Sequence, residues 1–204
     1  MKRISFALFC FLLAMGAVSA HGQAAPSATG RGLSVTAGVM GSVFQPDFKG
    51  YPDWTVKGDQ WVPTAEASDW ALFGIGAYVD VKFTRWIQIE GEARFSRFNQ
   101  YQNIHQDNYL IGPRIPIHRY GRFTPYAKAL VGITSMDMGP NPNGTGSDPT
   151  GRFLTAAYGG GVDVKLTRRF SLRAVDVEYQ QMPEWFGSSA SPYGASVGLS
   201  YKIF

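Results

Sequence analysis

The chain has 204 residues, of which 45% are hydrophobic, 14% aromatic and 17% charged, with 24 Gly and a single Cys. Its low charge and many aromatic residues exclude an intrinsically disordered chain, and one Cys excludes a fold held by intrachain disulfides. The net charge of +4 includes Lys2 and Arg3, so without the first twenty residues it is 4 − 2 = +2. That charge is too small to indicate a nucleic-acid partner.

Residues 1–20 have the features of a secretory signal peptide. Lys2 and Arg3 precede an apolar run from Ile4 to Val18, and Ala20 ends a set of small residues that suits signal peptidase. The run is shorter than the roughly 20 apolar residues that a membrane-spanning helix needs. We therefore predict cleavage after Ala20 or after Ala24. A short periplasmic segment over 21–31 and a folded domain over 32–204 would follow.

The rest of the chain alternates apolar residues with small or polar ones, which is the two-residue period of β-strands. Regular alternation covers seven windows: 33–43, 73–83, 87–95, 109–117, 127–133, 154–166 and 193–203. An eighth window, 170–179, changes parity, and one extra residue near Arg173-Ala174 restores a single apolar face, as in a β-bulge. The pattern predicts eight strands, each about as long as the 9–11 residues of a strand that crosses a bilayer.

The connections between these strands alternate between long and short. The long ones cover 45–70, 98–106, 135–151 and 182–191, and the short ones cover 84–85, 119–122 and 167–169. Four long loops at one end and three short periplasmic turns at the other are typical of an outer-membrane β-barrel. Aromatic residues near the strand ends indicate its two interfacial girdles. They are Phe83, Trp86, Tyr120, Phe123 and Phe170 beside the turns, and Trp70, Phe98, Tyr109, Phe153, Tyr179 and Tyr193 towards the loops.

The charged residues of the strands indicate which face meets lipid. A Lys or Arg that faces lipid at the midplane costs about 2–4 kcal/mol. When the β-bulge is counted, all charged residues of the strands lie on the face opposite to the apolar residues. We predict a polar lumen that is cross-linked by ion pairs and too full for a wide aqueous pore. The expected ion-pair network comprises Asp80, Lys82, Glu90, Glu92, Arg94, Arg114, Lys128, Asp163, Lys165, Arg173, Asp176, Glu178 and Lys202.

Three stretches carry a family resemblance: Gly74 to Lys82, Gly159 to Thr167 and the closing strand Val197 to Phe204. With the hairpin pattern, they make residues 32–204 similar to the small OmpA/OmpX-type outer-membrane proteins of the outer membrane protein beta-barrel domain family. The resemblance implies an all-β, eight-stranded antiparallel up-and-down transmembrane barrel. It also implies an aromatic end that the barrel-assembly machinery recognises. That signal would use Leu199, Tyr201, Ile203 and Phe204, although two residues rather than one separate Tyr201 from Phe204.

The sequence offers little chemistry, and we expect no enzymatic activity, cofactor or metal site. His105 and His118 fall at opposite ends of the predicted barrel. Ser96 can approach His105, but no adjacent His-Ser pair matches the barrels that modify lipid A. A soluble lipocalin would place its apolar residues around a ligand cavity, and it usually has a flanking helix.

We expect a structural and surface-interaction protein of the outer membrane, most simply a monomer, in contact with membrane lipid and lipopolysaccharide. The alternative is a small-solute channel. The first loop is long and rich in aromatic residues, which indicates a contact surface rather than disorder. Trp54 and Trp61 are its candidate contacts with an external ligand.

Overall fold

The computed structural model describes residues 33–46, 53–57, 60–64, 71–84, 86–99, 104–137, 150–185 and 188–203. The expected signal peptide, the segment over 21–31 and Phe204 lie outside the described residues. Within the described part of the chain, no helix has the length and apolarity to cross a membrane.

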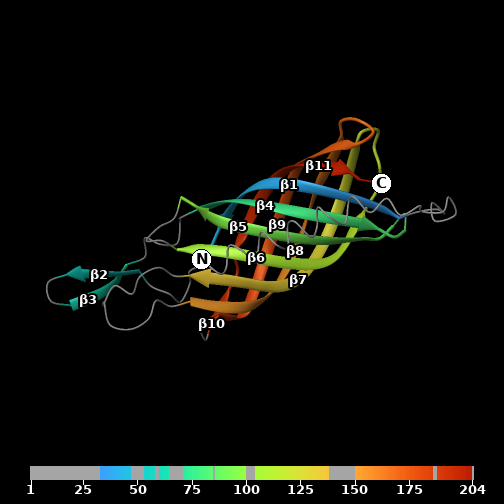
Figure 1. Cartoon of the computed structure of the whole chain (residues 1–204). Helices are drawn as coiled ribbons and strands as arrows, with labels where there is room; N and C mark the ends of the chain where they lie inside the picture. Colours follow the sequence, from blue (N-terminus) through green and yellow to red (C-terminus); the bar gives the residue numbers. More distant parts are fainter. Residues whose placement is uncertain are drawn as a thin grey trace, which may run out of the picture. The chain divides into compact units, whose positions relative to one another are not determined.

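Eight long antiparallel strands form a closed ring, in which each strand pairs with the next and β11 pairs back with β1 (Figure 1). These strands are β1 (Ser34–Gln45), β4 (Leu72–Lys82), β5 (Gln88–Phe98), β6 (His105–Pro116), β7 (Phe123–Asp137), β8 (Thr150–Lys165), β9 (Phe170–Trp185) and β11 (Tyr193–Lys202). The ring confirms the predicted eight-stranded up-and-down barrel. Closure pairs each of these eight described strands on both sides, as a membrane-spanning sheet requires.

Three shorter strands lie where the sequence predicted only loops. In the first long connection, β2 (Asp53–Lys57) and β3 (Gln60–Thr64) pair as a hairpin, and β10 (Ser188–Ala190) pairs with the extended end of β9. The sequence carried a signal for this hairpin, because Gly58-Asp59 separates two short runs of strand-forming residues. The Pro- and Gly-rich composition around those runs hid it.

The predicted bulge in β9 is confirmed at Ala174. Beside β8, Val162 pairs with Val175 while Asp163 pairs with Arg173, so Ala174 is the extra residue. The pairing of β9 with β11 shifts at the same place. A second bulge, which the alternation did not reveal, adds one residue to β5 between Phe95 and Phe98.

The two faces of the barrel wall separate as predicted. Outward positions carry half-exposed apolar side chains such as Val39, Ile75 and Ile111, which in a membrane face lipid, whereas the charged residues of the mid-strand region are buried inside. Phe153 is a correction, because it is 8% exposed and not part of the outer girdle. It shares its parity with buried Thr155 and therefore points inward.

Candidate functional site

The barrel interior contains one connected network of ion pairs. Ten of the thirteen residues expected there belong to it: Asp80, Glu90, Glu92, Arg94, Arg114, Lys128, Asp163, Arg173, Asp176 and Glu178. Six carboxyl groups therefore share four cationic side chains. All but Asp163 are less than 10% exposed, so these groups depend on one another rather than on water.

Arg173, on β9, reaches across the barrel to β5. Its Nη2 donates to Glu90 Oε2 at 2.7 Å and its Nη1 to Glu90 Oε1 at 3.1 Å. Such a two-point contact suits the planar guanidinium group. Because β5 and β9 are four strands apart in either direction around the ring, this pair spans the lumen. Nη1 also lies 3.0 Å from Asp176 Oδ2, and Nη2 lies 3.5 Å from Asp80 Oδ2 on β4.

Arg114, on β6, makes a second set of cross-links nearer the short turns. Its Nη1 donates to Asp80 Oδ2 at 3.1 Å and to Gln88 Oε1 at 2.9 Å, while its Nη2 donates to Asp163 Oδ2 on β8 at 2.5 Å. Asp80 and Asp163 stand on strands that are again four apart around the ring. The single buried side chain of Arg114 thus links its own strand, β6, to β4, β5 and β8.

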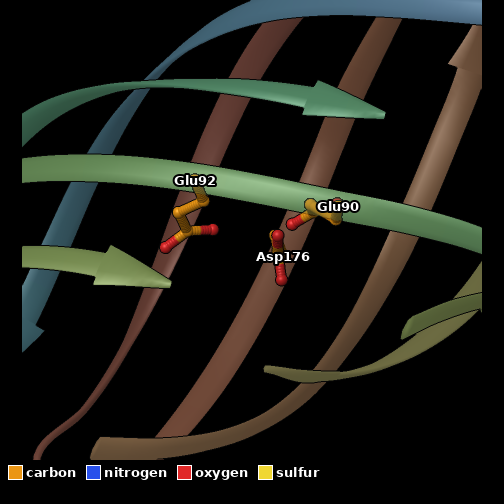
Figure 2. Close-up of side chains that lie close together, drawn as sticks. All are labelled: Glu90, Glu92 and Asp176. Carbon is orange, nitrogen blue, oxygen red and sulfur yellow. The ribbon is translucent and has the colours of Figure 1, made fainter. Parts of the chain in front are cut away.

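Lys128, on β7, lies among four carboxylates from β5 and β9. Its Nζ is 2.8 Å from Asp176 Oδ2 and from Glu178 Oε2, 3.1 Å from Glu92 Oε2 and 3.4 Å from Glu90 Oε1. Figure 2 shows Glu90 and Glu92 on one strand and Asp176 on another. One carboxylate oxygen of each residue lies within 4.8 Å of those of the other two. Such a group has the ligand type that a hard cation prefers. Here the ammonium group of Lys128 already supplies the positive charge.

Arg94 completes the ionic layer on the side of the long loops. Its Nη1 lies 3.2 Å from Glu178 Oε1, its Nη2 pairs with Glu92, and its guanidinium carbon lies 4.1 Å from the centre of the Phe44 ring. The side chain of Arg94 is completely buried. Its charge is therefore balanced by carboxylates on two opposite strands and by an aromatic face.

Buried tyrosine rings support the other guanidinium groups. Arg173 stacks on Tyr78 at 3.6 Å from the ring centre, and Arg114 stacks on Tyr126 at 3.7 Å. The Tyr78 ring occupies the space that a side chain on Gly38 would need, because a Cβ there would lie 2.4 Å from the ring. The absence of a side chain at Gly38 therefore leaves room for the Tyr78 ring, and Arg173 stacks on that ring.

Neutral polar side chains form the next layer towards the long loops. Gln106 donates to Gln180 Oε1 at 3.0 Å, Asn108 donates to the same oxygen at 3.1 Å and to Thr134 Oγ1 at 2.9 Å, and Thr155 bonds to Thr134 at 2.6 Å. Gln180 then donates to Glu178 Oε1 at 2.7 Å, which joins this layer to the ionic one. Sequence reasoning missed these residues because it searched the inner face only for charges.

The interior is less polar than the sequence predicted. Leu110, Leu130 and Ala157 form a buried apolar cluster among the inward-facing residues. Towards the long loops, the inward positions carry buried apolar side chains: Phe44, Leu72, Ile104, Met136, Phe153, Met182 and Ala190. The sequence did contain a signal for this apolar part of the interior, because β6 and β7 carry apolar residues on both faces. Alternation alone shows which face a residue is on, but not whether the inner face is polar or apolar.

Three lysines expected in the network do not join it. Lys82, Lys165 and Lys202 end β4, β8 and β11 beside the short turns, and they form no ion pair with any residue that the structure describes. Lys165 and Lys202 are exposed and Lys82 is half-buried. The strands leave the enclosed interior at this level, so water can solvate the ammonium groups. The expected near-balance of interior charge is therefore wrong.

The remaining candidate residues occupy separate places. Leu199 and Ile203 lie half-exposed on the outer face, and the Tyr201 ring packs against Phe170 at 5.1 Å. Trp54 lies in β2 and Trp61 in β3, where their strands pair. Ser96 is buried in the lumen, whereas the alternation of β6 places His105 on the outer face, so the two do not share one face of the wall. His105 and His118 are at opposite ends of the barrel, as predicted.

The closed ring of eight strands, with an apolar outside and an ionic inside, is the architecture of a small outer-membrane barrel. The family model described as outer membrane protein beta-barrel domain matches residues 10–202. The chain belongs to this family. No curated protein matches it.

Solved barrels show the same fold as this family member at low identity. The N-terminal barrel domain of Pseudomonas aeruginosa OprF is 12% identical, with a TM-score of 0.58, over 85% of this chain and 100% of that one. OprG from the same organism is 13% identical, with a TM-score of 0.55, over 84% and 96%. Neisserial surface protein A is 12% identical, with a TM-score of 0.52, over 85% and 99%. These likenesses identify the fold.

Proposed function

We propose that this member of the family is a closed barrel that anchors surface-exposed loops in the outer membrane and does not conduct solutes through a wide pore. The cross-lumen pairing of Arg173 with Glu90 carries this proposal, because a pair that crosses the interior occupies space that a continuous aqueous path would need. Eight-stranded barrels are in any case only wide enough for side chains to fill.

Two further layers support a closed lumen. The amide layer around Gln180 lies above the ionic layer, and inward-facing Phe44, Leu72 and Met182, each at most 2% exposed, lie towards the long loops. An ion on a path through the barrel would lose its hydration at that apolar level and meet tightly paired charges below it. Each step is unfavourable for transport.

Conductance in planar bilayers tests this proposal. The wild-type barrel should show no large, steady conductance. Replacing Arg173 with Ala should produce measurable openings or a less stable barrel, because it removes the side chain that crosses the lumen. Arg97→Ala is the matched control, since Arg97 pairs with Asp107 outside the lumen and its side chain is 51% exposed. A wild-type conductance like that of a general porin would show that the protein is a channel.

We further propose that the β2–β3 hairpin contacts an external ligand or lipopolysaccharide through Trp54 and Trp61. The paired strands support this, because they give the segment a defined backbone register in which Trp54 pairs with Pro63 and Trp61 with Val56. Replacing residues 48–63 with a short Gly-Ser turn should leave the barrel folded and abolish binding to lipopolysaccharide. Trp54→Ala with Trp61→Ala should do the same with the loop length unchanged. Equal binding by all three proteins would show that the hairpin is not the contact.

Export would begin with removal of residues 1–20. Amino-terminal sequencing of the protein from outer-membrane fractions should start at His21, or at Ala25 if the second site is used. Recovery of the protein with an intact Lys2-Arg3 segment would contradict cleavage.

A further inference from the structure

The short-turn end of the barrel carries a concentrated positive charge. Seven described cations lie at the ends of the strands there or in the turns that join them: Lys82, Arg119, Arg122, Lys165, Arg168, Arg169 and Lys202. We call them the basic rim. The described acids nearest to this end are Asp80 and Asp163, each two residues before the end of its strand, and both already pair with Arg114.

The basic rim is not neutralised from within the described part of the chain. Its recorded side-chain partners are neutral: Arg119 Nε donates to the Gly121 carbonyl at 2.9 Å, and Arg169 Nη1 donates to Tyr201 Oη at 2.8 Å. Six of the seven side chains are exposed, and Lys82 is half-buried. The rim is therefore a surface of positive charge that no described acid neutralises.

The described residues of the long-loop end have no such excess. Near the ends of the strands there, two cations, Arg97 and Arg152, are accompanied by three acids, Asp107, Asp137 and Glu184. Arg97 is paired with Asp107. The charge of the described barrel is thus asymmetric along its axis. A general need for solubility would not produce that difference, because both ends meet water.

Exposed aromatic side chains surround the basic rim. Phe83, Trp86, Tyr120 and Phe123 are each 54–63% exposed beside the short turns. Such aromatic residues sit at the level of the lipid headgroups. Since the rim shares the turns with this aromatic collar, its cations lie within reach of headgroup phosphates.

The turns hold the rim in a fixed geometry. Thr167 Oγ1 accepts hydrogen bonds from the backbone N–H groups of Arg169 and Phe170 at 3.2 and 3.0 Å. Thr84 Oγ1 likewise accepts hydrogen bonds from the backbone N–H groups of Trp86 and Ile87. Gly121 allows the middle turn with a φ of 60°. Fixed turns lower the entropic cost of arranging several cations around one anion.

A hollow of about 440 Å³ opens within the rim. Its lining combines the cations Lys82, Arg119 and Lys165 with Trp86 and His118. The lining also includes Asp163, but its carboxylate already pairs with Arg114. Positive charge beside an aromatic face suits a ligand that has both an anionic group and an apolar part. A phospholipid headgroup with its attached glycerol has this combination.

We propose that the basic rim binds the phosphate groups of anionic phospholipids in the inner leaflet of the outer membrane. The short turns of such barrels face the periplasm, so the rim lies against that leaflet. Peptidoglycan also carries anionic groups, but it lies beyond the membrane surface, whereas these cations share the level of the aromatic collar. The proposal does not depend on whether the lumen conducts.

Nuclear magnetic resonance of the intact folded barrel tests this proposal. The barrel is placed in phosphatidylcholine nanodiscs, and phosphatidylglycerol replaces part of the phosphatidylcholine. The amides of residues 118–122 and 166–169 should shift with saturation, while those of Arg97 and Arg152 should not. Arg168→Gln with Arg169→Gln should weaken the apparent affinity about fivefold for each cation removed. The matched variant, Arg97→Gln with Arg152→Gln, removes the same charge at the other end and should leave the affinity unchanged.

Other outcomes would overturn the proposal. Equal shifts at both ends, or none, would show that the rim does not select anionic lipid. The same shifts on adding inorganic phosphate to pure phosphatidylcholine nanodiscs would identify a site for free anions. Shifts with peptidoglycan fragments but not with phosphatidylglycerol would assign the rim to the cell wall.

Discussion

Replacing Lys128 with Met removes the one ammonium group that four buried carboxylates share while keeping most of the volume of the side chain. The Lys128 side chain is 0% exposed, its partners are at most 1% exposed, and all four contacts lie between 2.8 and 3.4 Å. Removal of one partner from a buried ion pair costs about 3–5 kcal/mol. With a urea slope of about 2 kcal/mol/M, the unfolding midpoint should fall by roughly 1.5–2.5 M.

The assay is urea unfolding of the barrel in lipid vesicles, followed by tryptophan fluorescence. Arg97→Ala provides the comparison, because it breaks a pair with a half-exposed arginine and should cost about 0–1 kcal/mol. Adding Glu178→Gln to Lys128→Met should recover part of the loss, since one of the repelling carboxylates is then neutral. If Lys128→Met lowers the midpoint no more than Arg97→Ala does, the network is not what holds the barrel together.

Three further predictions concern other parts of the barrel. Gly38→Ala should destabilise it by about 1–3 kcal/mol in the same assay because the new Cβ would overlap the Tyr78 ring, whereas Gly41→Ala, with open space around its Cβ, should have little effect. Deleting Ala174 should give a barrel that still migrates as a folded species on unheated gels, since it removes only the extra bulge residue, while deleting Val177 should not, since it turns Glu178 outward. A metal chelator should leave the wild-type unfolding midpoint unchanged, because Lys128 neutralises the carboxylates of Glu90, Glu92 and Asp176.

Strand number, topology and the bulge were predictable from the sequence because each depends on local alternation. In β9, for example, the change of parity between Leu172 and Val175 located the extra residue that the pairing of Asp163 with Arg173 confirms. The β5 bulge escaped because β5 ends at Phe98, so this one apolar residue carries the changed parity, whereas Val175, Val177 and Tyr179 repeat it in β9.

The contents of the lumen were predictable only in outline. Alternation showed which charges point inward, but it could not show the height at which each strand stands relative to the others. That height places Lys128 among four carboxylates and leaves Lys165 outside the network. The stacking of Arg173 on Tyr78 over Gly38 depends on β9 facing β4 and β1 across the lumen, which it does only when the ring closes, so no window of sequence contains it.

The cross-lumen pairs also constrain the order of assembly. Arg94 and Glu178 are 84 residues apart in the chain, and Arg173 and Glu90 are 83 apart. A partly built sheet that holds β4, β5 and β6 would carry three carboxylates of the network, Asp80, Glu90 and Glu92, but only two of its cations, Arg94 and Arg114. Until Lys128 and Arg173 arrived, at least one buried carboxylate would lack a cation of its own, which is costly inside a membrane. Hairpins of this protein should therefore not enter the bilayer one at a time. We expect β5 and β9 to come together while water still reaches the inner face, so that these pairs are already made when the barrel enters the membrane.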